Sequence, residues 1–183
     1  MAERLERALP AAGAVIVSDY LKGAITRRLM TLVCDFAGRR RVPVLVDPKI
    51  PHLDYYRGAT IVTPNHHEAE AATHRPIRSD EDARAAGRDL RARVRCDAVL
   101  ITRGEHGMWL TDRDVEGSIP TVAREVSDVT GAGDTVAATL ALALGAGATF
   151  AEAAVLANHA AGIVVGKFGP ATLTPDELLA TFL

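Results

Sequence analysis

This sequence of 183 residues has few cysteines, no long apolar run and no sustained basic segment. Its two cysteines, Cys34 and Cys96, have no metal-type spacing, which argues against a disulfide framework or a zinc site and favours reduced thiols. The longest apolar stretch, 136–148, is rich in alanine and glycine and shorter than a membrane span. The N-terminus has no long apolar core of the signal-peptide kind. These absences predict a cytoplasmic protein with no membrane partner.

An excess of one charge is also absent. The net charge of −2, without a sustained basic run, gives no support for binding to nucleic acid or to a membrane surface. Arginines gather between positions 84 and 95, but Glu81, Asp82 and Asp89 offset them, as is typical of a solvated helix face. The apolar fraction of 48% is that of a soluble globular protein, and the length predicts one domain over residues 1–183.

Apolar runs and helical patterns alternate through the first two-thirds of the chain. Continuous apolar runs are typical of strands covered on both faces, and they occur at 14–17, 42–46, 60–62 and 98–101. A helix end at 1–9 precedes them, and helical patterns lie between them at 26–40, 66–73 and 80–94. This alternation predicts an α/β fold with a mostly parallel sheet and helices on both sides.

The pattern changes after residue 102. Residues 108–110 and 115–119 predict an antiparallel pair of strands, and alanine-rich helices follow at 131–145 and 150–163. Because alanine side chains are small, these helices should pack closely and hold the segment at 131 rigidly. A loop at 166–170 leads to a terminal helix that begins at Thr174-Pro175.

Polar clusters follow each of the first four predicted strands. They are Ser18-Asp19-Tyr20, Asp47-Pro48-Lys49, Thr63-Pro64-Asn65 and Thr102-Arg103-Gly104. Ligands of open α/β sheets bind outside the carboxyl ends of the strands, so the clusters point to a common crevice. The alternative is that polar residues only punctuate strand ends, which explains less well why Asp19, Asp47 and Asn65 occur together.

The segment 128–134, with the sequence D-V-T-G-A-G-D, combines a bare backbone with a helix start. Amides at such a helix start have no acceptor, and the helix dipole adds partial positive charge, which favours an anion. Asp134 places a carboxylate beside this site, where it is suited to take a proton from a hydroxyl that attacks a phosphoryl group. The alternative is a glycine-rich turn with an acidic helix start.

Four segments of the chain resemble, in the same order, motifs of the ribokinase-like (PfkB-type) carbohydrate kinases. They are the N-x-x-E motif at 65–68, T-x-G-x-x-G at 102–107, the signature at 128–134 and the adenine-pocket helix around 157–162. The resemblance implies a ribokinase-like, three-layer α/β/α fold. It also implies a carbohydrate kinase that uses ATP and Mg²⁺.

Within this family, the segments 18–23, 63–65 and 164–169 look most like the D-glycero-β-D-manno-heptose-7-phosphate kinases. The resemblance implies ATP-dependent phosphorylation of this sugar phosphate at C1. The product is the 1,7-bisphosphate on the route to ADP-heptose and the lipopolysaccharide core. There are two alternatives. The chain is part of another ribokinase-like sugar kinase, or it is a silent nucleotide-binding module that needs a partner chain.

The resemblance also implies roles for single residues. Asp134 is expected to be the base, and the amides of Gly131, Ala132 and Gly133 the anion hole. The nucleotide side is expected to comprise Asn65, His66, His67, Glu68, Thr102, Gly104, Gly107 and Asn158, with Glu68 acting on Mg²⁺ through water. The family often binds a monovalent cation such as K⁺ beside the anion hole, where Asp128 and Thr130 hold the matching positions, along with main-chain oxygens near Val164, Lys167 and Gly169.

Several of these residues have a structural alternative. Asn65 is also a plausible N-cap of the helix at 66–73, with Glu68 completing a capping box. His66 and His67 do not form H-E-x-x-H, so a surface or pocket-lining position is expected rather than a metal site. Asp19 and Lys22 either touch the sugar phosphate or pair and cap a turn.

The resemblance does not extend to the segment that precedes these motifs in sugar kinases of the family. That segment supplies the first strands, a Gly/Asn-rich sugar motif and the β-lid. Nothing in this sequence resembles those parts, nor the cytidylyltransferase domain fused to many heptose kinases. We therefore expect the C-terminal, nucleotide-binding portion of a kinase, which acts as a homodimer or with a partner chain that supplies the missing half.

Overall fold

The computed structural model describes residues 2–123 and 126–183 and contains a six-stranded sheet. The strands lie in chain order: β1 (Val15–Ser18), β2 (Val44–Asp47), β3 (Ile61–Val62), β4 (Ala98–Thr102), β5 (Met108–Thr111) and β6 (Glu116–Ile119). β1 to β4 are parallel, whereas β5 and β6 run antiparallel to their neighbours. The predicted parallel sheet with an antiparallel pair at its end is confirmed. β1 forms one edge of the sheet and β6 the other.

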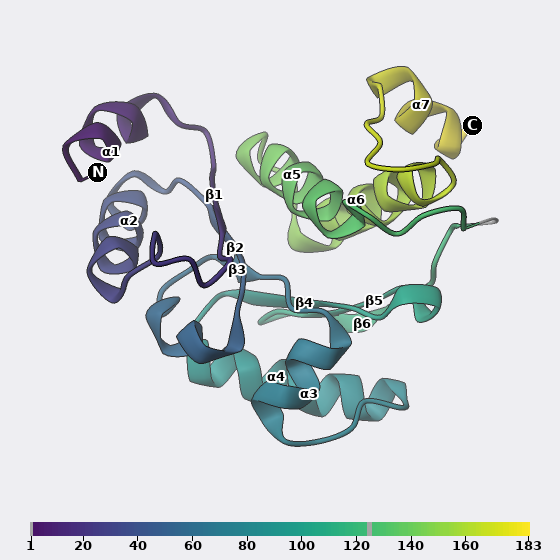
Figure 1. Ribbon diagram of the computed structural model, residues 1–183, viewed down its shortest axis with the longest axis horizontal. Coiled ribbons are helices and arrows are strands. Elements are labelled where there is room, and N and C mark those ends of the chain that lie inside the picture. The colour runs from purple at the N-terminus through teal and green to yellow at the C-terminus, as the bar shows by residue number, and fades with distance from the viewer. Residues whose placement is uncertain (1, 124–125) are drawn as a thin grey trace.

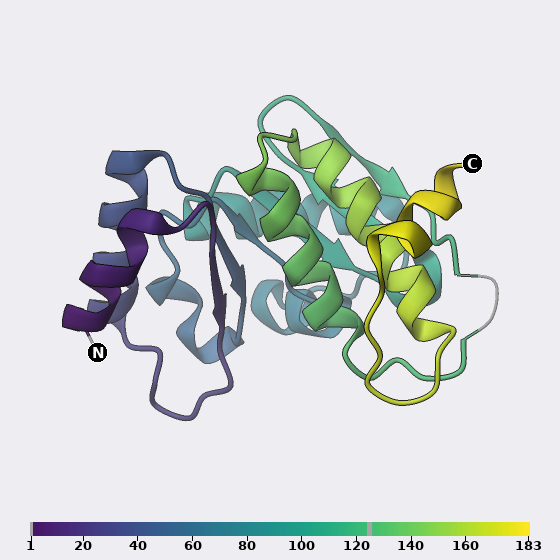
Figure 2. The ribbon, with the colours of Figure 1, turned by 90° about the horizontal axis from the view of Figure 1, so that it is seen from above.

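Helices cover both faces of this sheet (Figure 1). One layer contains α2 (Arg27–Arg40), α3 (His66–Thr73) and α4 (Asp80–Val94), and α1 (Ala2–Ala8) packs against α2. The opposite layer contains α5 (Ala132–Gly145) and α6 (Phe150–Val165), which lie side by side in both ribbon views (Figure 2). α7 (Pro175–Leu179) and the 3₁₀ turn η4 (Ala180–Phe182) follow, and α7 packs on α6. The predicted three-layer arrangement is confirmed.

The alternation of side chains along each strand divides the core between the two layers. Val46, Val62 and Val99 are buried against the α2–α4 layer, where Met30 and Leu90 meet them. The intervening strand residues face α5 and α6, and this second cluster includes Leu45, Ile61, Leu100, Leu110 and Leu140. Because both faces are covered, the central strands are apolar throughout, which is why they appear as continuous apolar runs in the sequence.

Small residues let α5 and α6 approach the sheet and each other. Ala137 and Ala141 of α5 and Ala153, Ala154 and Ala157 of α6 are buried. At the end of α5, a Cβ added to Gly145 would lie 3.0 Å from the carbonyl oxygen of Gly13, next to β1. This close packing fixes the start of α5 relative to the carboxyl ends of the strands.

The element boundaries differ from the predicted ones where proline or a long-range contact intervenes. β2 begins at Val44 rather than at residue 42, because Pro43 has no N–H to donate to the ladder. The sequence pattern does not predict the 3₁₀ turn η2 (Ile50–Tyr55), which follows β2. Two further 3₁₀ turns, η1 (Leu9–Ala11) and η3 (Gly104–His106), lie in connections. In the described ranges, no helix has the length and apolar character needed to cross a bilayer.

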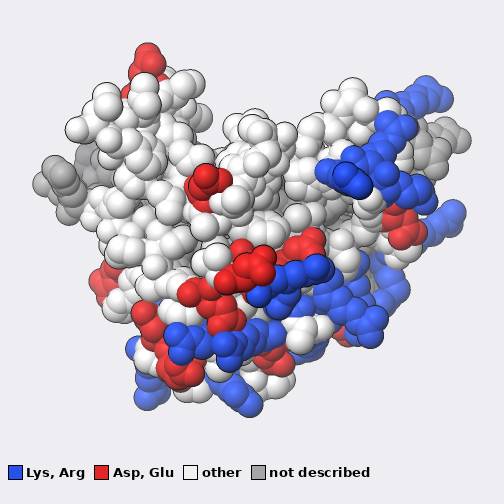
Figure 3. Space-filling model, turned by 180° about the vertical axis from the view of Figure 1, so that it is seen from behind, with Lys and Arg blue, Asp and Glu red and all other residues white. Residues whose placement is uncertain are grey.

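The charged residues on the face that Figure 3 shows are mixed in sign and gather over the α2–α4 side, whereas the α5–α6 side is mostly uncharged. On α4, Arg88 forms a bidentate pair with Glu116 of β6, with the closest N–O distance 2.7 Å. Arg113 pairs with Asp97 at 3.1 Å. Of the α4 arginines, Arg84 and Arg88 pair with Glu81 and Glu116, whereas Arg91 and Arg93 donate to main-chain carbonyls.

Candidate active site

The carboxyl ends of β2, β3 and β4 face the start of α5 across a cavity of about 200 Å³, which we call the phosphoryl cavity. Its lining brings together Asp47, Lys49, Thr63, Asn65, Glu68, Thr102, Gly131, Gly133, Asp134 and Val136. Three of the four polar clusters that follow the strands therefore share one cavity. The exception is the cluster after β1, whose Asp19 lies elsewhere.

The start of α5 has the features of an anion site. Gly131 takes a left-handed conformation with φ +80°, and no side chain caps the helix. Ala132 N–H donates to the carbonyl of Val129 at 3.2 Å, so this amide is occupied, unlike our expectation for it. Within the described residues, the amides of Gly133 and Asp134 have no acceptor. The open donors and the helix dipole point to an anion at this place.

Asp134 lies in the first turn of α5, is exposed and lines the phosphoryl cavity. Its position beside the open amides is the one that the sequence predicts. A carboxylate next to an anion site has no stabilising role for the anion itself, since like charges repel. It is suited instead to accept a proton from a group that approaches the anion.

Asn65 and Glu68 form the capping box of α3. The Asn65 side chain accepts from Glu68 N–H at 2.9 Å, and Glu68 Oε2 accepts from Asn65 N–H at 3.0 Å. The capping alternative is therefore present, and the same two side chains also line the phosphoryl cavity. The ring centroids of His66 and His67 lie 3.8 Å apart with the rings tilted by 42°, and neither side chain lines this cavity or the larger one described below. His67 is exposed on the outer side of α3 beside Glu70.

Asp47 and Lys49 also line the phosphoryl cavity, although the sequence motifs assign no role to either as an individual residue. Lys49 Nζ forms an ion pair with Glu68, and this hydrogen bond raises the pKa of Lys49. Burial raises the pKa of Asp47, and the negative charges of Glu68 and Asp134 add to this effect. The available signal in the sequence is a D-P-K triplet directly after a buried strand.

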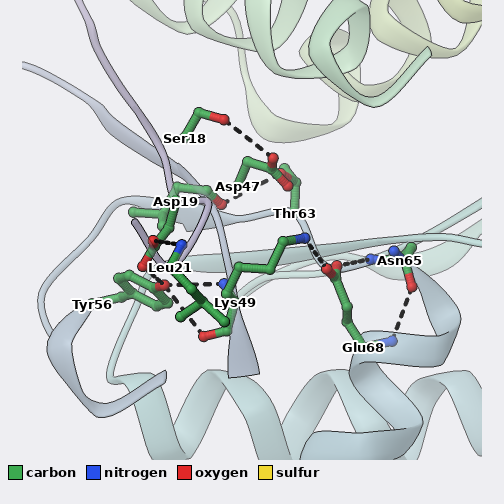
Figure 4. Close-up of polar contacts among 10 residues, drawn as sticks. Ser18, Asp19, Leu21, Asp47, Lys49, Tyr56, Thr63, Asn65 and Glu68 are labelled. Atoms are coloured by element: carbon green, nitrogen blue, oxygen red, sulfur yellow. Dashed lines mark hydrogen bonds and ion pairs between the residues drawn. The ribbon is translucent and has the colours of Figure 1, made fainter. Parts of the chain in front are cut away.

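Asp19 has a structural role at the end of β1 (Figure 4). Its side chain is only 1% exposed and accepts from Tyr56 Oη at 2.7 Å, from Leu21 N–H at 2.8 Å and contacts His52 Nδ1 at 2.7 Å. Burial opposes ionisation, but these hydrogen bonds hold the pKa of Asp19 below its ordinary value. Of our two alternatives, the structure shows the turn cap, without an ion pair to Lys22 among the described residues. Lys22 is exposed near the Tyr20 ring.

A second, larger cavity of about 490 Å³ adjoins the start of α5 and has mostly apolar walls. Its lining includes Thr102, Gly104, Gly107 and Asn158, the residues that we expect at a nucleotide site, together with Ala132 and Gly133. Gly107 has φ +72°, and a Cβ there would lie 2.1 Å from the carbonyl oxygen of Ile119. Only glycine fits, because the segment after β6 crosses directly over this turn.

Asn158 has a contact that the motif does not reveal. It is buried on α6, and its Nδ2 donates to the carbonyl of Pro120 at 2.7 Å. One turn further along α6, a Cβ on Gly162 would lie 2.8 Å from Val122. The same face of α6 therefore holds the segment 120–123, of which Thr121 and Ala123 line the larger cavity.

The two segments predicted to hold a monovalent cation lie against each other. The amides of Ser127 and Asp128 donate to the carbonyl of Val165 at 2.7 and 3.2 Å. Asp128 Oδ1 accepts from Thr130 N–H at 2.8 Å, and this bonding to Thr130 lowers the pKa of Asp128. The end of α6 thus packs against the segment 127–130, which leads directly into α5.

Comparisons with known proteins give the family of this chain. The model of the pfkB family carbohydrate kinases matches residues 2–177. Bifunctional protein HldE of Geotalea uraniireducens is 52% identical over 167 residues, which cover 91% of this chain and 34% of the relative. HldE of Sodalis glossinidius is 49% identical over 97% of this chain and 37% of the relative. The chain thus spans about a third of the length of these relatives.

Solved structures share the fold. Phosphofructokinase-2 from Escherichia coli, in complex with potassium, superposes with a TM-score of 0.82 at 19% identity, covering 98% of this chain and 60% of that one. Ribokinase of Arabidopsis thaliana, complexed with ribose and ATP, gives a TM-score of 0.81 at 25% identity, covering 97% and 58%. With a family model that matches nearly the whole chain, and with the ribokinase-like fold, the chain belongs to the pfkB family of carbohydrate kinases.

Proposed function

We propose that the chain is the nucleotide-binding portion of a kinase that phosphorylates D-glycero-β-D-manno-heptose 7-phosphate at C1 with ATP. The observation that carries this proposal is that the two cavities meet at the start of α5. Gly133 and Thr102 line both of them. An adenosine group fits the larger, mostly apolar cavity. Its phosphates then extend past the open amides of Gly133 and Asp134 into the phosphoryl cavity.

The chemistry follows from this placement. Asp134 accepts the proton of the sugar hydroxyl while the hydroxyl oxygen bonds to the γ-phosphorus. The bond from this phosphorus to the β–γ bridging oxygen breaks, and ADP leaves. The amides at the start of α5 stabilise the negative charge on the group in transfer.

The donor set of the phosphoryl cavity fits Mg²⁺. Magnesium is usually held by one or two carboxylates together with substrate phosphates and water. Glu68 and Asp47 offer such carboxylates, and no group of three or more His, Cys, Asp or Glu in the described ranges is arranged to hold a metal alone. Magnesium bound with the nucleotide would neutralise phosphate charge, and Glu68 is placed to hold it through water. For K⁺, the oxygen-lined junction of 127–130 with 164–166 is the candidate site.

The sugar is proposed from the relatives rather than from the cavity. HldE proteins are about half identical to this chain, and the segments 18–23 and 164–169 look like those of heptose-phosphate kinases. Asp19 is buried, so it supports the loop after β1 and does not touch the sugar. We propose that residues outside this chain of 183, in a longer protein, in a partner or in a second copy, complete the sugar site. Ile16 is 46% exposed on the edge strand β1, where such a contact would lie.

The direct test is ADP release from Mg²⁺–ATP with heptose 7-phosphate, with fructose 6-phosphate and ribose as rival acceptors. When the part that completes the sugar site is present, we expect turnover with the heptose phosphate and not with fructose 6-phosphate or ribose. Asp134→Asn should lower kcat by a factor on the order of 10²–10⁴ while ATP binding, measured by calorimetry, is retained.

Other outcomes separate the alternatives. Turnover with a rival acceptor instead would favour another sugar kinase of the family. ATP binding without turnover on any acceptor would favour the silent nucleotide-binding module. Full activity of Asp134→Asn would remove this residue from the role of base.

A further inference from the structure

Lys49 is the only positively charged residue among the described residues that line the phosphoryl cavity. It shares this cavity with three carboxylates, those of Asp47, Glu68 and Asp134. A cavity with this lining repels a triphosphate unless cations compensate the negative charge. The helix dipole of α5 supplies only partial charge, equivalent to roughly half a unit.

A hydrogen bond to Tyr56 fixes the backbone of Lys49 (Figure 4). Its N–H donates to Tyr56 Oη at 3.0 Å, and Tyr56 is fully buried and donates in turn to Asp19 at 2.7 Å. The Lys49 side chain, in contrast, is 35% exposed and extends toward Glu68. Lys49 therefore combines a fixed main chain with a partly exposed ammonium group at the cavity.

The present partner of this ammonium also has other bonds. Glu68 Oε1 receives Lys49 Nζ, while Oε2 accepts from the amide of Asn65 and so closes the capping box of α3. Glu68 therefore keeps its position when the lysine leaves. An incoming phosphate carries more charge than one carboxylate and competes well for the same ammonium.

We propose that Lys49 is a substrate-contacting residue that binds the γ-phosphoryl group. On nucleotide binding, its ammonium exchanges the Glu68 carboxylate for a γ-phosphate oxygen opposite the amides of α5. The transferring group is then held between a full positive charge and the helix start, and Glu68 Oε1 is released on the metal side while Oε2 stays bonded to the amide of Asn65. This inference rests on the proposed kinase function for the presence of ATP, but not on the identity of the sugar.

The test compares nucleotides with and without the γ-phosphate. Binding of Mg²⁺–ADP and of the non-hydrolysable Mg²⁺–AMP-PNP is measured by calorimetry for the wild type, Lys49→Met, Lys49→Gln and Lys49→Arg. We expect both neutral variants to weaken AMP-PNP on the order of tenfold and to leave ADP unchanged. Lys49→Arg should recover most of the loss, because it keeps the charge.

Arg57→Met is the matched control, since it removes an exposed positive charge that pairs only with Asp54 at the surface of the described part of the chain. Melting temperatures of all variants show whether the fold is kept. Equal weakening of AMP-PNP and ADP, or no weakening of either, would overturn the role of Lys49. If the wild type binds neither nucleotide, both this role and the proposed nucleotide site are wrong. Turnover with a rival acceptor in place of the heptose phosphate would contradict only the proposed substrate.

Discussion

Four helices of the described chain begin in the same way, and α5 begins differently. α3, α4, α6 and α7 each start with a reciprocal capping box, formed by Asn65, Ser79, Thr149 and Thr174 with the acidic residue three positions on. α5 starts with Gly131 in a left-handed conformation and without a side-chain cap. A capping box satisfies amides that would otherwise be open, and it is worth about 1 kcal/mol of stability.

This contrast shows where the molecule forgoes local stability. The amides of Gly133 and Asp134 stay available because no serine, threonine or asparagine occupies the position before the helix. The rigid packing of α5 on α6 and on the sheet compensates for the missing cap. The uncapped start on a well-packed helix therefore supports our proposal that the ligand binds at this end of the domain.

Closing the open start with a negative charge should have the largest effect. A Cβ at Gly133 meets nothing within 4 Å, so Gly133→Asp fits the fold without a clash. Its carboxylate occupies the place of the phosphoryl group, and we expect nucleotide binding or transfer to fall on the order of 100-fold or more. The same negative charge interacts favourably with the helix dipole, so the free energy of unfolding should rise by roughly 0.5 kcal/mol. Calorimetric titration with Mg²⁺–ATP and urea denaturation measure the two effects.

Gly133→Ala is the control for this change. It adds the Cβ without charge, so nucleotide binding should be retained while the unfolding free energy rises by roughly 0.5 kcal/mol. If alanine and aspartate weaken binding equally, the effect is steric and the anion site is not at this amide.

Removing the N-cap of α3 or of α6 should have smaller effects, and only one of the two changes should lower activity. Asn65→Ala and Thr149→Ala each remove a cap, and each should lower the free energy of unfolding by about 1 kcal/mol. Only Asn65→Ala should also lower kcat/KM, because Asn65 lines the phosphoryl cavity and holds Glu68. Thr149 lies at the start of α6 and lines neither of the two cavities, so its loss should leave kcat/KM unchanged. Equal loss of activity in both variants would show that Asn65 acts through stability alone.

Local patterns predict much of this molecule, because strands, helix starts and the 128–134 motif depend on neighbouring residues. The pairing of Asn65 with Glu68 and of Ser79 with Asp82 is visible at the spacing of a capping box. The contacts that the sequence does not reveal join distant parts of the chain. Asp19 meets Tyr56 across 37 residues, and Asn158 meets the carbonyl of Pro120 across 38.

The same limit applies to Lys49. Its place in the cavity depends on the 3₁₀ turn η2 and on Tyr56 beneath it, neither of which has a periodic signal. A sequence pattern can thus indicate which chemistry is present at a strand end. Which side chain faces the ligand is decided by tertiary packing.

The smallest effect we expect is on the loss of stability at low pH, and it comes from the capping box of α6. The backbone N–H of Thr149 donates to Glu152 at 2.8 Å, and this bond lowers the pKa of Glu152 in the folded state. As the pH falls, Glu152 therefore takes up its proton in the unfolded chain before it does so in the folded one. Its contribution to the free energy of unfolding is complete above the unfolded pKa of about 4.3. This contribution is lost as the pH falls through the lower pKa of the folded state. Glu152→Gln should therefore flatten the fall in melting temperature below this pH. Glu105→Gln, at a glutamate that caps no helix among the described residues, should leave the slope as in the wild type. Identical acid slopes for wild type and Glu152→Gln would mean that the carboxylate contributes nothing to the cap, and that the hydroxyl of Thr149, which accepts from Glu152 N–H at 3.2 Å, closes this helix start by itself.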